Sequence, residues 1–224
     1  MQMMWKRRPV WPPGPPIPPI QPRKPVRILA VSDEESKFIW EHFDPELFRG
    51  VDLILSCGDL KASYLSYLVT MIPAPLLYVY GNHDGAYDRN PPLGCQCIDG
   101  AVTEFQGIRI AGLGGCMGDD PANPYQFTEE KMEKRVRKLQ SDLRRSRKLD
   151  ILVTHAPAAG VGDTSAFHQG FRCFHQLYRD NVPTLHLFGH LHRQNHHGPE
   201  ARQGVFQVGA TRAVNCTGYR LIEL

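Results

Sequence analysis

Apolar residues along the chain gather into short runs that stop at polar residues, and this pattern predicts most of the fold. Three continuous runs, at 26–31, 51–56 and 75–80, are apolar enough for buried strands. Helices are expected between them, at 35–42 and at 62–71, the second with apolar residues at near-helical spacing. This rhythm is typical of parallel strands joined by helical crossovers.

The middle of the chain has a different texture. Short runs broken by glycines, at 97–98, 102–105 and 108–113, predict a meander of strands. A helix should follow, because Thr128 is a suitable N-cap and two glutamates come directly after it, at the positive end of the helix dipole. We expect this helix to run toward Lys148 and to end in basic residues.

Four more strands are expected in the last third of the chain. The runs at 151–154 and 185–188 each stop at polar residues that include histidine. The segments at 204–210 and 219–224 indicate closing strands.

Five of the apolar runs end in side chains that can ligate a metal ion. These are Asp33 with Glu35, Asp59, Asn82 with His83, His155, and His190 with His192. Sites in α/β sheets form beyond the carboxyl ends of the strands, so the five ends should converge. Carboxylate, amide and imidazole groups without cysteine suit divalent ions such as Mn²⁺, Fe²⁺ or Zn²⁺.

Each of these pieces alone has a simpler explanation. Gly58-Asp59 and Gly81-Asn82 could each be a turn, and a lone histidine such as His155 is more often a hydrogen-bonded core residue. The order, the spacing and the strand-end context together favour one metal site over five unrelated features.

The composition is that of an ordinary globular protein. The chain has 224 residues, of which 42% are hydrophobic and 22% charged, and this suits one α/β domain. No stretch approaches the roughly 18–20 apolar residues of a membrane helix, and the basic N-terminus is not followed by the apolar run of a secretory signal. The spacing of the six cysteines does not indicate disulfides, so we expect reduced thiols and a cytoplasmic location.

Residues 1–25 form a proline-rich basic tail. They hold nine of the 19 prolines and five basic residues, without any acidic one. Subtracting five from the net charge of +3 leaves −2 for residues 26–224, so the globular part is near neutral. Because proline is excluded from helix interiors and central strands, we expect a disordered, extended tail. A ligand for an SH3-like partner or an anionic surface is the alternative.

The strand-end motifs resemble those of the calcineurin-like metallophosphoesterase superfamily, which run D-x-H, G-D, G-N-H-[DE], H and G-H-x-H. In this chain they are Asp33-Glu34-Glu35, Gly58-Asp59, Gly81-Asn82-His83-Asp84, His155 and Gly189-His190-Leu191-His192. The segment 56–60 is similar to the small bacterial branch of Icc-related predicted phosphoesterases. The resemblance covers 26 to about 220, nearly all of the chain outside the tail.

The resemblance implies an α/β fold, a four-layer α/β/β/α sandwich of two mixed sheets, with residues 26–224 as the catalytic domain. It implies two divalent metal ions, with Mn²⁺ expected first and Fe²⁺, Mg²⁺ or Zn²⁺ as alternatives. One metal would be held by Asp33, Glu35, Asp59 and His192, and the other by Asp59, Asn82, His155 and His190. A hydroxide bridging the metals would attack phosphorus in line, with His83 as the general acid.

Two positions depart from the family pattern. Residue 35 is Glu where most of the superfamily has His, which lowers the net charge of the site and favours harder metals. Residue 62 is Ala where many relatives have an aspartate that orients the acid histidine. Asp163 and His168, in the loop after His155, are candidates for substrate contact or for support of the ligands, with a plain loop role as the simpler alternative.

These features predict a two-metal hydrolase of phosphate monoesters or diesters, with a small-molecule substrate and no membrane association. The alternative is an interaction scaffold of the same fold with a weak or vestigial metal site. A nuclease ranks below both, because the near-neutral body lacks a basic stripe for a nucleic-acid backbone. The basic residues at 144–148 suit a solvated helix end rather than a nucleic-acid partner.

Overall fold

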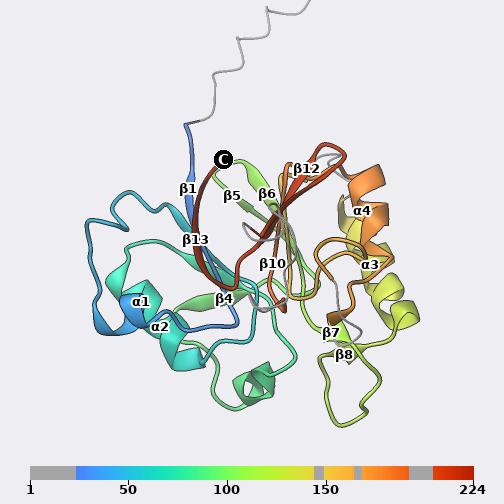
Figure 1. Ribbon diagram of the computed structural model, residues 1–224, viewed down its shortest axis with the longest axis horizontal. Coiled ribbons are helices and arrows are strands. Elements are labelled where there is room, and N and C mark those ends of the chain that lie inside the picture. The colour runs from blue at the N-terminus through green and yellow to red at the C-terminus, as the bar shows by residue number, and fades with distance from the viewer. Residues whose placement is uncertain (1–23, 144–148, 164–167, 192–203) are drawn as a thin grey trace, which may run out of the picture.

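Two mixed sheets lie against each other in the computed structural model, which describes residues 24–143, 149–163, 168–191 and 204–224 (Figure 1). The first sheet has the strand order β13-β1-β2-β3-β4. Its members are β1 (Arg27–Ser32), β2 (Leu53–Ser56), β3 (Leu76–Tyr78), β4 (Cys95–Cys97) and β13 (Gly218–Glu223). All are parallel except β13, which pairs with β1 in the antiparallel sense.

The second sheet has the strand order β11-β12-β10-β9-β6-β5. Its members are β5 (Val102–Phe105), β6 (Ile108–Leu113), β9 (Ile151–Thr154), β10 (Leu185–Phe188), β11 (Val205–Val208) and β12 (Thr211–Asn215). The four central strands are parallel, and the two edge strands are antiparallel to their neighbours. A small third sheet pairs β7 (Cys116–Met117) with β8 (Gln126–Phe127).

Helices cover the outer face of each sheet, which gives four layers (Figure 1). The first sheet is covered by α1 (Lys37–Glu41) and α2 (Ala62–Met71), and the second by α3 (Glu129–Leu143) and α4 (Phe174–Asp180). A short 3₁₀ helix, η1 (Asp84–Asp88), follows β3. The α/β/β/α sandwich of two mixed sheets is therefore confirmed.

The continuous apolar runs are explained by burial on both faces of each sheet. In β1, Ile28 and Ala30 face the layer between the sheets, whereas Leu29 and Val31 face the helices α1 and α2. All four side chains are fully buried. Side chains alternate across a strand, so a strand with two buried faces needs apolar residues at every position.

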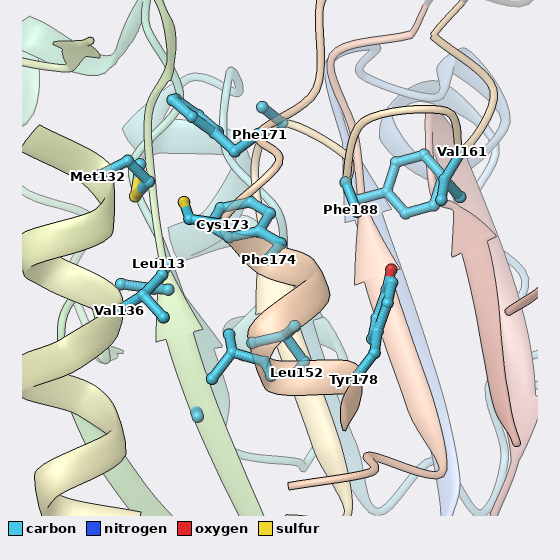
Figure 2. Close-up of a cluster of buried hydrophobic side chains, with 14 of the residues drawn as sticks. Leu113, Met132, Val136, Leu152, Val161, Phe171, Cys173, Phe174, Tyr178 and Phe188 are labelled. Atoms are coloured by element: carbon cyan, nitrogen blue, oxygen red, sulfur yellow. The ribbon is translucent and has the colours of Figure 1, made fainter. Parts of the chain in front are cut away.

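The core between α3, α4 and the second sheet is shown in Figure 2. Val136 of α3 and Phe174 of α4 pack there with Leu152 of β9. One buried polar residue, His186 of β10, lies next to this core with both ring nitrogens engaged. Its Nδ1 is 2.6 Å from the hydroxyl of Tyr178, and its Nε2 is 2.8 Å from Oγ1 of Thr154. The two hydrogen bonds satisfy the imidazole without a charge.

Some sequence-based expectations were wrong. The segments around 97–113 do not form one meander: β4 joins the first sheet parallel to β3, while β5 and β6 form an antiparallel pair in the second sheet. The elements α4, η1 and β12 were not predicted. The expected basic end of α3, at 144–148, lies outside the described residues, and α3 is described as far as Leu143.

Two expectations from the sequence concern disulfides and membrane-spanning helices. All six cysteines are free thiols, as the sequence predicts. No helix in the described ranges combines the length and the apolar character needed to cross a bilayer.

Candidate metal centre

The ligand candidates lie where parallel strands end, at the seam between the two sheets. Asp33 follows β1 and Asp59 follows β2 in the first sheet, while His155 follows β9 and His190 follows β10 in the second. Three of them adopt left-handed backbone conformations, with φ of 60° at Asp33, 57° at Asp59 and 65° at His190. Such φ values are costly for residues other than glycine and concentrate at functional sites. The backbone therefore turns sharply at these ligand positions.

Glycines at three of the strand ends allow the loops to approach closely. A Cβ on Gly81 would collide with the carboxylate of Asp59, and a Cβ on Gly58 would collide with the backbone of Gly81. A Cβ on Gly189 would collide with the side chains of Ser32 and Asp33. The glycines of the G-D, G-N-H and G-H motifs are thus required by packing between strand ends, because no larger residue fits there.

Asp33, Asp59 and His155 form a group of ligand-type side chains. Each offers one ligand atom, and these atoms all lie within 4.8 Å of one another. Asn82 adds an amide oxygen, because its Oδ1 lies 3.0 Å from Nε2 of His155. An oxygen and nitrogen donor set with two carboxylates fits a divalent cation of hard to borderline character.

The ring of His155 is held in the orientation that a metal ligand needs. Its Nδ1 lies 2.8 Å from the carbonyl oxygen of Cys57, so this nitrogen carries the proton and donates it. Nε2 then faces Oδ2 of Asp59 at 3.3 Å. A backbone carbonyl on the far nitrogen is the common way to fix a ligating imidazole. The contact also joins the end of β2 to the end of β9.

The charges at the site influence each other strongly. Burial works to lower the pKa of His155, but the neighbouring Asp59 carboxylate outweighs it and raises the pKa to about 9. Burial likewise works to raise the pKa of Asp59, yet the hydrogen bond and charge of His155 leave it below its usual value. The pKa of Asp33 is raised by burial. A bound cation would stabilise both carboxylates in their charged form.

Asp33 ties the two sheets together at the site. Both of its carboxylate oxygens accept the backbone N–H of His190, at 3.0 Å each, and Thr217 donates its hydroxyl to Oδ2 at 3.4 Å. The ring of His190 lies 4.9 Å from that of His155 and 5.0 Å from that of His168, between centroids. His168 therefore lies beside the ligand group.

His83, the expected general acid, lies at the open side of the group. Its backbone N–H donates to Oδ1 of Asp59 at 2.7 Å, and its Nε2 lies 4.0 Å from Oδ2 of the same carboxylate. The side chain is 79% exposed, so an incoming substrate can reach it. The expected orienting aspartate is replaced by Ala62, which begins α2.

Asp84 supports the site, and sequence reasoning did not assign it a role. It is buried, and its Oδ2 accepts the backbone N–H groups of Asp59 at 2.9 Å and Gly81 at 2.7 Å. Burial raises its pKa to about 6. Its carboxylate thus fixes two ligand-bearing loops. Its place directly after Asn82-His83 in the motif was the available signal.

Glu35 is not part of the group formed by Asp33, Asp59 and His155. Its carboxylate instead accepts from Lys61, with Nζ at 3.2 Å and the backbone N–H at 3.3 Å. Glu35, which departs from the family motif, is therefore ion-paired with Lys61 in this structure.

Three further residues were expected at the site from the sequence: Asp163, His168 and His192. Asp163 accepts the backbone N–H groups of Gly160 at 2.6 Å and Gly170 at 3.0 Å, so its carboxylate closes its own loop. His168 lies against His190, as described above. His192, the remaining expected ligand, lies outside the described residues.

Comparison with known proteins is consistent with this geometry. The family model for the calcineurin-like phosphoesterase matches residues 30–194. The structure of TT1561 from Thermus thermophilus is similar, with a TM-score of 0.60 and 19% identity, over 90% of this chain and 99% of that one. GAP50, described as the anchor in the inner membrane complex of Plasmodium, has a TM-score of 0.55 and 14% identity, over 90% and 82%. A search of curated proteins gave no match.

Proposed function

Because the chain belongs to the calcineurin-like phosphoesterase family, we propose that it is a two-metal hydrolase of small phosphate esters. Membership in the family implies metal-dependent hydrolysis of a phosphoester. The observation that supports the finer proposal is the convergence of Asp33, Asp59 and His155, with Asn82 beside them, at the ends of four strands from two sheets. A protein that only binds partners has no physical need for such convergence.

The group of Asp33, Asp59 and His155 fits a divalent ion, and we propose that the centre holds two. We assign Asp33, Asp59, Glu35 and His192 to one ion, and Asp59, Asn82, His155 and His190 to the other. Bound there, the ions would activate water and stabilise the charge on the phosphoryl oxygens. Asp59 is thus assigned to both ions. This agrees with its position, because its Oδ2 lies 3.3 Å from Nε2 of His155 and 4.0 Å from Nε2 of His83.

The chain's own residues supply orientation and a proton. Cys57 fixes the ring of His155 through its carbonyl oxygen, and Asp84 fixes the loops of Asp59 and Gly81. We assign His83 the role of general acid, which donates the Nε2 proton to the leaving oxygen of the ester. Its exposure and its distance of 4.0 Å from Asp59 support this role.

We propose Mn²⁺ as the preferred metal, with Fe²⁺, Mg²⁺ or Zn²⁺ as alternatives. Glu35 offers oxygen where most of the family offers nitrogen, and hard cations prefer oxygen. For Glu35 to bind the metal, its carboxylate must turn from Lys61 or share an oxygen with it. The free thiols support a cytoplasmic location.

The test begins with protein stripped of metals. Mn²⁺, Mg²⁺, Fe²⁺, Ni²⁺ or Zn²⁺ is restored, and release of p-nitrophenol is followed from p-nitrophenyl phosphate and bis-p-nitrophenyl phosphate. We expect metal-dependent release that falls at least 100-fold in Asp59→Asn. The preferred compound separates a monoesterase from a diesterase. Silence with every metal, together with elemental analysis that finds none bound, would overturn the proposal in favour of the scaffold.

A further inference from the structure

A hollow of about 490 Å³ opens beside His83, on the side of the first sheet. Its lining comes from the segments that follow β1, β2 and β3, from the start of α2 and from the helix η1 with the residues just after it: Glu35, Asp59, Leu60, Lys61, Ala62, Ser63, His83, Asp84, Ala86, Tyr87 and Asn90. The volume falls within the range of about 300–1,000 Å³ that is usual for small-molecule sites. Asp59 and His83 belong both to the proposed reaction centre and to this lining.

Part of the lining of the hollow is apolar and firmly packed. Leu60, Ala62, Ala86 and Tyr87 line it, and the hydroxyl of Tyr87 donates to the carbonyl oxygen of Leu60. Leu60 and Tyr87 are buried, so this wall is packed against the body of the protein. Asn90 adds one neutral polar side chain at the rim.

The charges around the hollow do not favour an anionic group inside it. The one lysine in the lining, Lys61, is paired with Glu35 at 3.2 Å, and it keeps this partner when the Glu35 carboxylate shares an oxygen with a metal ion. The other charged groups near the reaction centre include the carboxylate of Asp59. An anionic moiety in the hollow would meet an ion-paired lysine and nearby carboxylates, whereas a neutral moiety would meet mostly apolar surface.

The position of His83 decides which part of the substrate enters the hollow. Displacement at phosphorus is in line, so the leaving oxygen departs on the side opposite the attacking water. The proposed proton donor must face that oxygen, and His83 lines the hollow together with Asp59. The group attached to the leaving oxygen therefore extends past His83 into the hollow.

We propose that this hollow binds the leaving alcohol of the substrate and selects an uncharged, largely apolar alcohol built on one or two rings. This inference rests on the proposed function and narrows its substrate class to phosphate esters of such alcohols. The apolar wall around Tyr87 supplies binding energy, and the paired Lys61 gives an anionic alcohol little attraction.

The test uses two phenols of nearly equal size that differ in charge. The phosphates of methyl 4-hydroxybenzoate (neutral) and 4-hydroxybenzoate (anionic) are compared, as monoesters or as methyl diesters according to the class that is turned over. We expect kcat/KM to be at least about 10-fold higher for the neutral ester, beyond the difference in their non-enzymatic rates. Equal values would overturn the inference and leave the proposed hydrolase standing.

Variants at Ala86 give a second, independent readout. Ala86 is exposed, so Ala86→Leu should fill the hollow without unfolding the protein, and Ala86→Lys should add an unpaired cation. We expect Ala86→Leu to lower kcat/KM for the neutral ester about 10-fold and Ala86→Lys to shift the preference toward the anionic one. Gly85→Ala is the matched control, because a Cβ there meets no heavy atom within 4 Å. If the preference does not change in either Ala86 variant, the hollow does not bind the alcohol.

Binding of the free alcohol separates failure of this inference from failure of the hydrolase. Methyl 4-hydroxybenzoate is titrated onto the full chain, and backbone amide shifts are followed by NMR. We expect shifts concentrated at residues 60–63 and 83–90, weakened in Ala86→Leu. If no ester is turned over, such shifts would still support the site, and their absence would overturn it.

Discussion

At the scale of single residues, the centre depends on glycines as much as on ligands. Gly81 separates the end of β3 from Asn82, and its backbone lies against the Asp59 carboxylate. The requirement is purely steric, because Gly81 is not among the residues with positive φ. Gly85, four positions later, faces open space and also has no positive φ.

We expect Gly81→Ala to damage the centre because its Cβ would displace the Asp59 carboxylate. Metal affinity should fall at least 10-fold, and the free energy of unfolding should drop by about 1–3 kcal/mol from the forced shift. Calorimetric metal titration and urea unfolding measure the two effects. Gly85→Ala should change neither by more than about 0.5 kcal/mol. Equal metal affinity in both variants would contradict the steric argument.

Exchanging the side chain of Glu35 should change which metal ion the centre prefers. Glu35→His replaces a carboxylate with an imidazole and releases Lys61 from its ion pair. We expect the preference to shift from Mn²⁺ or Mg²⁺ toward Zn²⁺, because nitrogen ligands favour borderline metals. Competition titrations with paired metals measure this shift. Glu35→Gln is the control that releases Lys61 but keeps an oxygen donor. An unchanged order of metals in Glu35→His would show that residue 35 does not ligate.

At the scale of elements, the sequence predicts strands and helices where the apolar pattern is strong. The helix α2 has the bounds 62–71 that the spacing predicts. By contrast, β4 is only three residues long and largely exposed, so nothing local shows which sheet it joins. The strand β12 contains an exposed Arg212 and a buried Asn215, which disguise its buried character.

In the candidate site, too, some features could be predicted from the sequence and others could not. The convergence of Asp33, Asp59 and His155 could be predicted because each follows an apolar strand, and sites in α/β sheets form beyond the carboxyl ends of strands. The pair of Glu35 and Lys61 could not be predicted, because it joins residues 26 positions apart through a side-chain conformation. The supporting role of Asp84 depends on which backbone N–H groups the folded loops direct at it.

A buried histidine should couple the packing of β10 and α4 to pH. Burial lowers the pKa of His186 to about 3, well below its ordinary value of 6.5. Between these values the unfolded chain binds a proton that the folded chain does not, so stability falls as the pH drops below 6.5. The loss approaches about 1.4 kcal/mol per pH unit for this one group.

We expect His186→Gln to flatten that dependence. Glutamine does not titrate, and its amide can replace the bonds to Tyr178 and Thr154. Urea unfolding between pH 7 and pH 5 should show about 1–2 kcal/mol less acid destabilisation in the variant. His175→Gln is the control: His175 lies in α4, and its Nε2 contacts the carbonyl oxygen of Ala159. Equal slopes for wild type and His186→Gln would mean that folding does not lower the pKa of His186.

At the scale of the whole molecule, the centre is one of the places where the two sheets are joined. Asp33 holds the N–H of His190, and His155 holds the carbonyl of Cys57, each bond running from one sheet to the other. Ions placed there would bind the folded protein and not the unfolded chain. Bound metal should therefore stabilise the contact between the two sheets.

We expect Mn²⁺ at 100 times its Kd to stabilise the stripped protein by about 2.7 kcal/mol for each ion bound. For a chain of this size, that corresponds to a rise in Tm of about 5–10 °C. Differential scanning calorimetry measures the change. In Asp59→Asn the rise should be largely lost. The same Tm with and without metal in the wild type would argue against ligation by folded residues.

The pairing of β1 with β13 leaves one edge of β1 open while the protein is being synthesised. Arg27 of β1 faces Glu223 of β13, and 223 minus 27 is 196 positions of chain. At about 5–20 residues per second, a ribosome needs roughly 10–40 s to cover that distance. During this interval one edge of β1 has no partner, and an open strand edge invites pairing with other chains. The newborn protein therefore passes through a period of exposure to such pairing, which ends when β13 has been made and covers this edge of β1.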